Sequence, residues 1–349
     1  MALRAPCRSK LAGRAPILIP DPSQPIVILS PGLSQSFAIA DVLRGHIPGL
    51  CLLGYPLAGE RDRPRRPFDR YVGADEGEPA VANGTAIMTG AEASEHVLKG
   101  HDRVRMGEIE FERRNLWFYD KAAALRRAEE LGVPVPLTWT SYDDIAGRPQ
   151  PIFFKPAREG TGGLRKRAPS PKAIPSFARS GHYLFQEVIE GPSVIGFGFL
   201  ADRGKVVASS LHHEILSTPV HGGSAVAVEA YESTRVEQLA QRLIVDFQYS
   251  GWGLVEFKPC VRRGDFVLME VNAKFWASIE FTLRTRPLFP HLLFGVRTEA
   301  EPIRRMLWPS RALRNGLHRL PAAAARALPA ARTREPLSWR DFARSVFPG

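Results

Sequence analysis

Three oxygen-bearing side chains have the types and spacing of a metal site. Glu256 lies in one apolar stretch, and Glu270 and Asn272 lie in the next. Residues 262–265 between the stretches, Arg-Arg-Gly-Asp, are typical of a hairpin turn, which places Glu256 opposite the other two side chains on one sheet face. Opposed like charges destabilise a strand pair, and oxygen ligands without His or Cys favour Mg²⁺ as the compensating ion. The alternative is a solvated hairpin with ordinary exposed acids.

A lysine beside a glycine-rich turn is compatible with a phosphate-binding site. Lys155 ends an apolar stretch, and Gly160, Thr161, Gly162 and Gly163 follow it. The backbone N–H groups of such a turn and a nearby ammonium group can contact the same phosphate oxygens. The segment matches neither the P-loop nor the dinucleotide-binding glycine pattern. A glycine-rich hairpin with an exposed lysine is the alternative.

A third segment has the pattern of a purine slot. It consists of Gln186, Glu187, Val188, Ile189, Glu190 and Gly191. A purine needs an apolar slot with a backbone edge that reads its amino group, and its ribose needs an acid. A strand that simply ends in a turn has the same pattern, so the segment alone leaves the choice open.

The elements that would position these segments indicate a mixed α/β chain. Residues 25–55 have the pattern strand, helix, strand, which favours a parallel βαβ unit, and 59–79 are predicted to form a surface loop. A well-marked helix is expected from Asp120 to Leu131, with Gly132 as its stop. Further elements are expected at 86–90 (strand), 92–99 (helix), 195–201 and 205–211 (strands) and 232–247 (helix).

Taken in order, these segments resemble the ATP-grasp superfamily of ligases over residues 25–300. The matching features are the helix that ends in Gly-Val-Pro-Val-Pro, the Phe-Lys-Pro strand, the glycine loop, the 186–191 hinge and the acidic hairpin. The resemblance implies an α/β and α+β chain, with a Rossmann-like N-terminal domain followed by a two-lobed ATP-grasp fold. This sequence adds a basic C-terminal tail.

Five parts follow from the resemblance and the composition. They are a disordered basic head (1–24), a Rossmann-like domain (25–115), the first ATP-grasp lobe (116–190), the second lobe with the metal site (191–300) and an Arg-, Ala- and Pro-rich tail (301–349). No biotin-attachment or glutaminase segment accompanies them, which argues against a complete carboxylase or carbamoyl-phosphate synthase.

The resemblance also implies a role for each candidate residue, with ATP and Mg²⁺ as cofactors and Mn²⁺ as a substitute ion. The phosphates would be contacted by Lys121 and Lys155 and covered by Gly160, Thr161, Gly162 and Gly163. The adenosine would be held by Gln186, Glu187, Val188, Ile189 and Glu190. The Mg²⁺ ion would be bound by Glu256, Glu270 and Asn272. Because the two opposed acids would repel each other, loss of Glu270 is expected to cost little stability.

Two segments resemble the carboxylate–amine ligases of the D-aspartate ligase type, namely 88–92 and 270–278. Lys274 stands where that pattern usually has Arg, so a point charge replaces planar two-point recognition, and a solvated lysine is the alternative. The implied activity is an ADP-forming ligase that activates an amino-acid-like carboxylate as an acyl phosphate and joins it to an amine. Lys155 and Lys274 are its expected catalytic residues, and the identity of both small-molecule substrates stays open.

Three histidines lie near the expected acceptor substrate. His212, His213 and His221 flank the segment 217–220. A histidine there can accept a proton from an attacking amine at neutral pH. Surface or structural histidines are the alternative, so their part in catalysis stays open.

Charge suggests a rival hypothesis from another class. The 349-residue chain has a formal net charge of +11, and residues 301–349 hold ten arginines against three acids, so +7 of the excess belongs to the tail. The rival is a non-catalytic nucleotide-fold protein that binds polyanions or anionic membrane through this tail. Weak contact of the tail with such surfaces is also compatible with the ligase. No nucleic-acid partner is expected, and the oligomeric state stays open, with a homodimer as one alternative.

Cysteine use and hydropathy suggest the compartment. Cys7, Cys51 and Cys260 are odd in number and far apart, which favours a reducing environment without disulfides. No apolar run approaches the roughly 20 residues that a membrane-spanning helix needs. A cytoplasmic protein is therefore expected.

Overall fold

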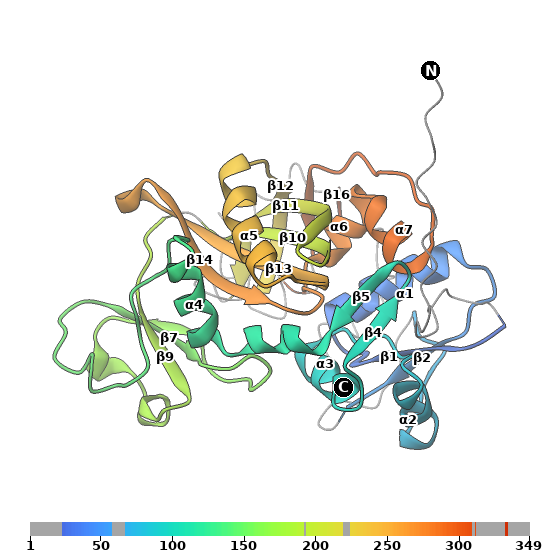
Figure 1. The fold of residues 1–349 in the computed structure, drawn as a ribbon, viewed down its shortest axis with the longest axis horizontal. Coiled ribbons are helices and arrows are strands. Elements are labelled where there is room, and N and C mark those ends of the chain that lie inside the picture. Colours follow the sequence, from blue (N-terminus) through green and yellow to red (C-terminus); the bar gives the residue numbers. More distant parts are fainter. Residues whose placement is uncertain are drawn as a thin grey trace.

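The computed structural model describes residues 23–57, 67–191, 193–218, 224–308, 311 and 332–333. Almost all of the expected head, most of the expected tail and His221 lie outside the described residues. Within them, a seven-stranded sheet occupies the middle of the molecule, a smaller sheet lies beside it at the lower left, and the N-terminal elements lie at the right (Figure 1). None of the described helices is both long and apolar enough to cross a bilayer.

The N-terminal elements confirm the expected βαβ unit. Ile26 pairs with Leu52 in a parallel register, and a helix connects the two strands. The elements are β1 (Ile26–Leu29), α1 (Ser34–His46), β2 (Leu52–Tyr55), β3 (Arg70–Tyr71), α2 (Ala74–Ala82) and α3 (Ala91–Leu98), and the sheet order is β1-β2-β3.

Two expectations for this part are wrong. The expected loop 59–79 contains β3 and the start of α2, although residues 58–66 lie outside the described chain. The expected strand 86–90 makes only one parallel bridge, between Ile28 and Ile87. Hydrogen bonds from Leu29 N–H to Ile87 O (3.0 Å) and from Ile87 N–H to Val27 O (2.8 Å) hold that segment at the sheet edge.

The segment after α3 leads into the helix that carries Lys121. The elements are the hairpin β4 (Arg103–Met106) and β5 (Ile109–Glu112), the 3₁₀ helix η1 (Arg113–Tyr119) and α4 (Lys121–Glu130). The Asp120 side chain caps α4 by accepting from the Ala123 N–H at 2.9 Å. Gly132 then adopts φ +68°, the left-handed conformation that ends a helix. The predicted helix is confirmed within two residues.

The smaller sheet has the order β6-β9-β7-β8. Its elements are β6 (Thr138–Trp139), β7 (Ile152–Pro156), β8 (Lys166–Ala168), η2 (Pro171–Ala173), η3 (Ser176–Arg179) and β9 (Tyr183–Glu187). Ile152, Phe154 and Phe185 are buried in its own hydrophobic cluster, separate from the main core. Alternation along β7 therefore sends Phe154 into this cluster and leaves Lys155 on the other face.

The seven-stranded sheet has the order β14-β13-β10-β11-β12-β15-β16. Its strands are β10 (Ile195–Asp202), β11 (Lys205–Thr218), β12 (Ser224–Ala230), β13 (Gly251–Cys260), β14 (Asp265–Asn272), β15 (Arg305–Leu307) and β16 (Arg332–Thr333), and the helices α5 (Thr234–Asp246), α6 (Ile279–Thr285) and α7 (Leu288–Phe294) and the 3₁₀ helix η4 (Val261–Arg263) complete this part. Gly196 of β10 pairs with His212 of β11 on one side and with Glu256 of β13 on the other. Because paired residues share a face, one face carries His212, Glu256 and Glu270 together.

Candidate active site

The predicted acidic hairpin is confirmed, and it places the two acids opposite each other. Glu256 of β13 pairs directly with Glu270 of β14, next to a β-bulge between Glu256 and Phe257. The Asn272 amide donates to Glu256 Oε1 at 3.0 Å and to Glu270 Oε1 at 3.4 Å. Three oxygen-bearing side chains therefore converge on one sheet face.

Lys121 and Lys155 approach Glu270 from two different elements. Lys121 is the first residue of α4, and its Nζ lies 2.8 Å from Glu270 Oε2 and 2.7 Å from Glu159 Oε2. Lys155, on β7, donates to Met269 O at 2.8 Å and lies 3.5 Å from Glu270 Oε2. Both lysines are only 3% exposed. Two buried ammonium groups thus share one carboxylate.

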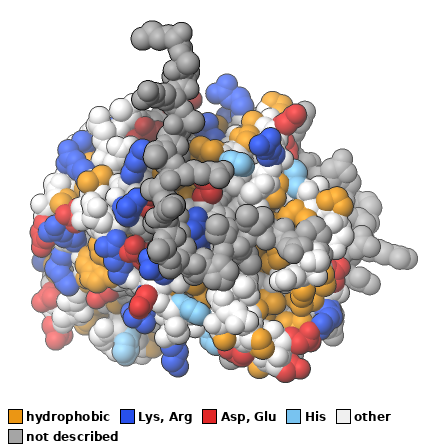
Figure 2. Space-filling view, turned by 45° about the vertical axis from the view of Figure 1, so that its right-hand side comes forward, with side chains coloured by type: hydrophobic (Ala, Val, Ile, Leu, Met, Phe, Trp, Pro, Cys, Tyr) orange, Lys and Arg blue, Asp and Glu red, His pale blue; other side chains and the backbone are white. Residues whose placement is uncertain are grey.

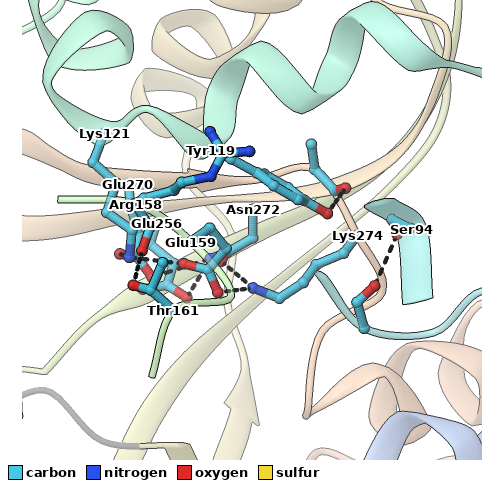
Figure 3. A network of polar contacts seen from close by, with 12 residues as sticks. Ser94, Tyr119, Lys121, Arg158, Glu159, Thr161, Glu256, Glu270, Asn272 and Lys274 are labelled. Atoms are coloured by element: carbon cyan, nitrogen blue, oxygen red, sulfur yellow. Dashed lines mark hydrogen bonds and ion pairs between the residues drawn. The ribbon is translucent and has the colours of Figure 1, made fainter. Parts of the chain in front are cut away.

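Glu159 and Arg165 complete the cluster, and sequence reasoning missed both. Glu159 directly precedes the glycine loop and pairs with Lys274 as well as Lys121, as Figure 3 shows. Lys274 Nζ also donates to Asn272 Oδ1 at 2.9 Å. Arg165 NH2 lies 3.7 Å from Glu159 Oε2. The sequence signal that could have identified Glu159 is its position between the strand that carries Lys155 and the glycine loop. We call Lys121, Lys155, Glu159, Arg165, Glu256, Glu270 and Lys274 the charged cluster.

Burial and neighbouring charges shift the pKa values of Glu270 and Glu256 in opposite directions. Burial raises the pKa of Glu270, but Lys121, Lys155 and Arg165 outweigh it and hold that pKa well below its usual value. Burial, followed by the charge of Glu270, raises the pKa of Glu256 to about 7. One acid of the opposed pair is therefore firmly ionised, and the other resists ionisation until another cation arrives.

The pKa values of Lys155 and Lys121 are also shifted in opposite directions. Burial lowers the pKa of Lys155 to about 8, against the pull of Glu270. Burial also lowers the pKa of Lys121, but Glu270 and Glu159 more than compensate and raise it above its usual value. Lys155 is thus the less well compensated cation, and an additional anion beside it would stabilise its charge.

The glycine loop lies beside the charged cluster. Gly160, Gly162 and Gly163 have φ values of +79°, +65° and +101°, a region that only glycine adopts without strain. The Thr161 hydroxyl donates to Arg158 O at 3.0 Å. A Cβ on Gly163 would lie 2.8 Å from the Tyr183 hydroxyl. The sequence of this turn therefore fixes a backbone conformation rather than side-chain contacts.

A cavity of about 790 Å³ opens between the sheets and the start of α1. Its lining includes Lys155, Glu159, Arg165, Glu256, Glu270, Asn272 and Lys274, the hinge residues Glu187 to Gly191, and Gly32 to Gln35 before and within α1. The lining does not include Lys121, Gln186 or the loop residues 160–163. Most of the site residues predicted from the sequence thus border a single space.

Comparison with known proteins identifies the fold. No protein-family model and no curated protein matches the sequence. An N5-carboxyaminoimidazole synthase from Aspergillus clavatus, solved in a complex with ADP, matches with a TM-score of 0.56 at 13% identity over 80% of this chain and 79% of that one. An L-amino acid ligase from Bacillus licheniformis matches with a TM-score of 0.52 at 14% identity, over 81% and 78%.

The chain has the ATP-grasp fold. A pyruvate carboxylase from Rhizobium etli matches as well, with a TM-score of 0.55 at 16% identity over 79% of this chain. This chain spans only 29% of that carboxylase. The ATP-grasp fold predicted from the order of five short segments is therefore correct, although identity to these three proteins is only 13% to 16%.

The hinge residues Gln186 to Glu190 differ in their contacts and in their exposure to the cavity. Gln186 is buried and its amide donates to the Thr138 hydroxyl at 2.9 Å, away from the cavity. The Glu187 carboxylate faces Arg262 and Arg263 and accepts from the Leu137 N–H at 3.0 Å. Val188, Ile189 and Glu190 border the cavity, and the Glu190 side chain is 77% exposed. Of the two hinge acids, Glu190 is the one with the less constrained carboxylate.

Of the three candidate histidines, the structure describes His212 and His213, and they lie in different environments. His212 is fully buried, and its Nε2 lies 3.0 Å from the Ser278 hydroxyl. Burial, followed by the charge of His213, lowers the pKa of His212 to about 4, so it is neutral near pH 7. His213 pairs with Glu229 at 3.1 Å. Neither of the two belongs to the cavity lining, but Ser278, which contacts His212, does.

Proposed function

We propose that the chain is an ATP-dependent ligase that converts a carboxylate into an acyl phosphate and joins it to an amine, with release of ADP and phosphate. The observation that carries the proposal is the charged cluster, in which lysines from α4 and β7 meet two opposed acids at the edge of a cavity of about 790 Å³. The L-amino acid ligase match supports the same class of reaction.

The donor set fits Mg²⁺. Glu256 and Glu270 offer carboxylate oxygens, and Asn272 would add its Oδ1 once the amide turns from its present contacts with the acids; oxygen ligands suit a hard divalent ion better than zinc. The pKa of Glu256, raised to about 7 by burial and by Glu270, indicates a carboxylate that lacks a compensating cation. No group of three or more His, Cys, Asp or Glu side chains arranged for a metal occurs among the described residues, so the amide is part of the expected set. Mn²⁺ has the same ligand preference.

The metal, when bound, would neutralise charge on the β- and γ-phosphate oxygens. Lys121 and Lys155 would then exchange part of their contact with Glu270 for phosphate oxygens, and the loop 160–163 would cover the phosphates and exclude water. Val188, Ile189 and Glu190, with Gln186 and Glu187 behind them, would hold the adenosine. Lys274 would contact the reacting carboxylate as a point charge.

The reaction would proceed in two balanced steps. An oxygen of the substrate carboxylate attacks the γ-phosphorus, the bond to the β-phosphate oxygen breaks, and ADP leaves. The amine nitrogen then attacks the acyl carbon, the bond to phosphate breaks, and a proton leaves the nitrogen. Positioning and charge neutralisation supply most of the catalysis, and no covalent enzyme intermediate is required.

The domain boundaries belong to this proposal. We assign 25–115 as a Rossmann-like domain, 116–190 and 191–300 as the two ATP-grasp lobes, and 1–24 and 301–349 as the head and tail. The parallel order β1-β2-β3 supports the first assignment. Both substrates would be small molecules, and a homodimer is compatible with the proposal.

The rival hypothesis, a polyanion- or membrane-binding protein without catalysis, has little support. Most of its basic tail lies outside the described residues. On the face drawn in Figure 2, Lys and Arg side chains are interspersed with Asp and Glu side chains. Ion pairs such as Arg70–Glu76 and Arg127–Asp246 offset much of this surface charge.

Calorimetric titration with ATP in the presence and absence of Mg²⁺ tests the proposal. We expect metal-dependent binding, and Glu256→Gln should weaken the metal dependence more than Glu229→Gln, which alters an acid distant from the cavity lining. The assignment would be contradicted if ATP does not bind, or if its binding is unaffected by Mg²⁺ and by Glu256→Gln.

A further inference from the structure

Glu214 is a buried acid that the proposed mechanism does not use. It lies on β11, is 8% exposed and borders the same cavity as the charged cluster. Its main-chain N–H donates to Val194 O at 2.9 Å, but among the described residues its carboxyl group has neither a hydrogen bond nor an ion pair. Two residues from His212 on the same strand, it lies on the sheet face that carries the acidic hairpin.

Its electrostatic surroundings are short of positive charge. Burial, followed by the charges of Glu256 and Glu270, raises the pKa of Glu214 well above its usual value, and Arg311 opposes this more weakly. The Arg311 guanidinium donates to Ala225 O at 3.0 Å and to Ala277 O at 2.7 Å. A cation from a ligand would therefore stabilise the ionised form of this carboxyl group, whereas an anionic ligand would oppose its ionisation further.

The neighbouring side chains provide donors and shape but no free charge. The Trp276 indole N–H is buried and lacks a partner among the described residues. Its ring occupies space that a Cβ on Gly198 would fill, at 2.5 Å, and the His212 ring similarly occupies the space above Gly196, at 2.6 Å. The two glycines of β10 thus allow these rings to lie against the sheet. We call His212, Glu214, Trp276 and Ser278 the β11 group.

The start of α1 borders the same cavity and has the opposite electrostatic character. This 13-residue helix has neither a side-chain cap nor an acid in its first turn, and residues 32–35 line the cavity. The free N–H groups and the positive end of the helix dipole favour a carboxylate. The cavity lining thus contains a helix start that favours an anion and, at the nine-tenths buried Glu214, a carboxyl group that favours a cation.

We propose that Glu214 binds the ammonium group of an amino-acid substrate, whose own carboxylate faces the first turn of α1. This inference rests on the proposed function and specifies the amine substrate, because the reacting carboxylate of the other substrate is assigned to Lys274. Only binding is involved, and no bond is made or broken at Glu214. The ion pair would fix the substrate relative to Glu256 and Glu270, which share the sheet face with Glu214.

Thermal-shift titration of the full chain tests this inference. Each of the standard L-amino acids is titrated at millimolar concentration, with and without Mg²⁺ and a non-hydrolysable ATP analogue. The amino acid that binds most tightly is then compared with its 2-hydroxy analogue, which replaces the ammonium group by a hydroxyl, and with its decarboxylated amine. We expect both analogues to bind at least tenfold more weakly than the amino acid.

A matched pair of variants locates the effect. Glu214→Gln keeps the shape of the side chain and should weaken amino-acid binding at least tenfold without changing binding of the nucleotide analogue. Glu229→Gln makes the same change on β12, where Glu229 already has His213 and Arg305 as partners, and should bind as the unchanged chain does.

Three results would overturn the inference: no amino acid binds, the 2-hydroxy analogue binds equally well, or Glu214→Gln retains full affinity. The analogue comparison uses the unchanged chain, so it decides the question even if the variant fails to fold. Equal binding of the decarboxylated amine would remove the carboxylate subsite at α1. Loss of amino-acid binding with intact Mg²⁺-dependent nucleotide binding would refute this inference alone, whereas absence of nucleotide binding would refute the proposed function.

Discussion

The charged cluster and the β11 group border one cavity and differ in how their polar atoms are satisfied. In the charged cluster, Glu270 faces two cations and Glu159 faces three, and Glu256 accepts from Asn272. In the β11 group, the indole N–H of Trp276 has no hydrogen-bond partner among the described residues, and the buried carboxyl group of Glu214 faces the charges of Glu256 and Glu270, which Arg311 offsets only in part.

This difference suggests two modes of ligand binding. Ligands at the charged cluster must exchange partners, because the lysines expected to contact phosphates are held by the acids expected to hold the metal. A ligand at the β11 group would instead meet the Glu214 carboxyl group, for which no ion pair has to be exchanged. Four pairs of variants sharpen this comparison, and they are ordered by the size of the expected effect.

The opposed acids should respond very differently to loss of charge. Glu270→Gln leaves the buried Lys121 and Lys155 without their carboxylate and should lower the free energy of unfolding by about 3–5 kcal/mol. Glu256→Gln removes an acid whose ionised form is already disfavoured and should change it by less than about 1 kcal/mol. Urea denaturation measures both. Equal losses of stability in the two variants would show that the ion pairs of Glu270 with Lys121 and Lys155 do not stabilise the fold.

This prediction corrects the expectation from the sequence that loss of Glu270 costs little. Repulsion between two opposed acids was the only interaction that the hairpin itself revealed. The structure adds two buried lysines beside Glu270, and their attraction outweighs the repulsion.

His212 should make stability depend on pH. Its pKa is lowered to about 4 in the folded chain, against about 6.5 in the unfolded chain, so between these values the unfolded state binds more protons. Stability should therefore fall as the pH is lowered from about 6.5 to 4, by at most about 3 kcal/mol from this group. His212→Gln should lack this part of the slope, as seen in urea denaturation at several pH values, and His213→Gln should retain it. Parallel slopes for all three proteins would contradict a buried, neutral His212.

Lys155 should contribute to nucleotide binding more than to folding. Its ammonium group is buried at a cost, so Lys155→Met should keep the fold but weaken binding of Mg²⁺–ATP by about 1.5–3 kcal/mol, the range for a hydrogen bond to a charged group. Lys205→Met, at an exposed lysine of β11, is the control. Calorimetric titration gives both affinities, and equal affinities would remove Lys155 from the phosphate site.

The glycine loop should show the smallest effect. Gly162 has φ +65° and open space around its Cα, so Gly162→Ala adds backbone strain without a clash and should cost about 1 kcal/mol of stability. Gly147 also has open space but no such φ, and Gly147→Ala should be neutral or slightly stabilising. Thermal denaturation of the pair measures the difference, and its absence would mean that the loop does not hold the left-handed conformation.

The features predicted correctly from the sequence are those with a local cause. A turn, two alternating strands and opposed acids lie within twenty residues, so the β13–β14 hairpin followed from its own sequence, as did α4 from its cap and its glycine stop. Glu159, Arg165 and Glu214 were missed because most of the residues that define their surroundings are distant in the sequence. Glu159 meets Lys274 only when the smaller sheet packs beside the larger one.

The wrong predictions have a physical reason too. Arg70 and Tyr71 have no strand pattern of their own and form β3 because they pair with Leu53 and Gly54. The α2 helix contains Pro79, which argued for a loop. Neither tertiary pairing nor tolerance of an interior proline can be recognised in a charge-rich, Gly- and Pro-containing segment.

The most direct test of the central claim is to identify the nucleotide product while trapping the activated carboxylate. The chain is incubated with Mg²⁺–ATP, a set of amino acids and related carboxylates, and hydroxylamine in place of the amine, and the products are separated by chromatography. The account predicts a hydroxamate together with equal amounts of ADP and phosphate, and loss of all three in Glu256→Gln. Formation of AMP and pyrophosphate, or of ADP without any hydroxamate from any carboxylate, would contradict it.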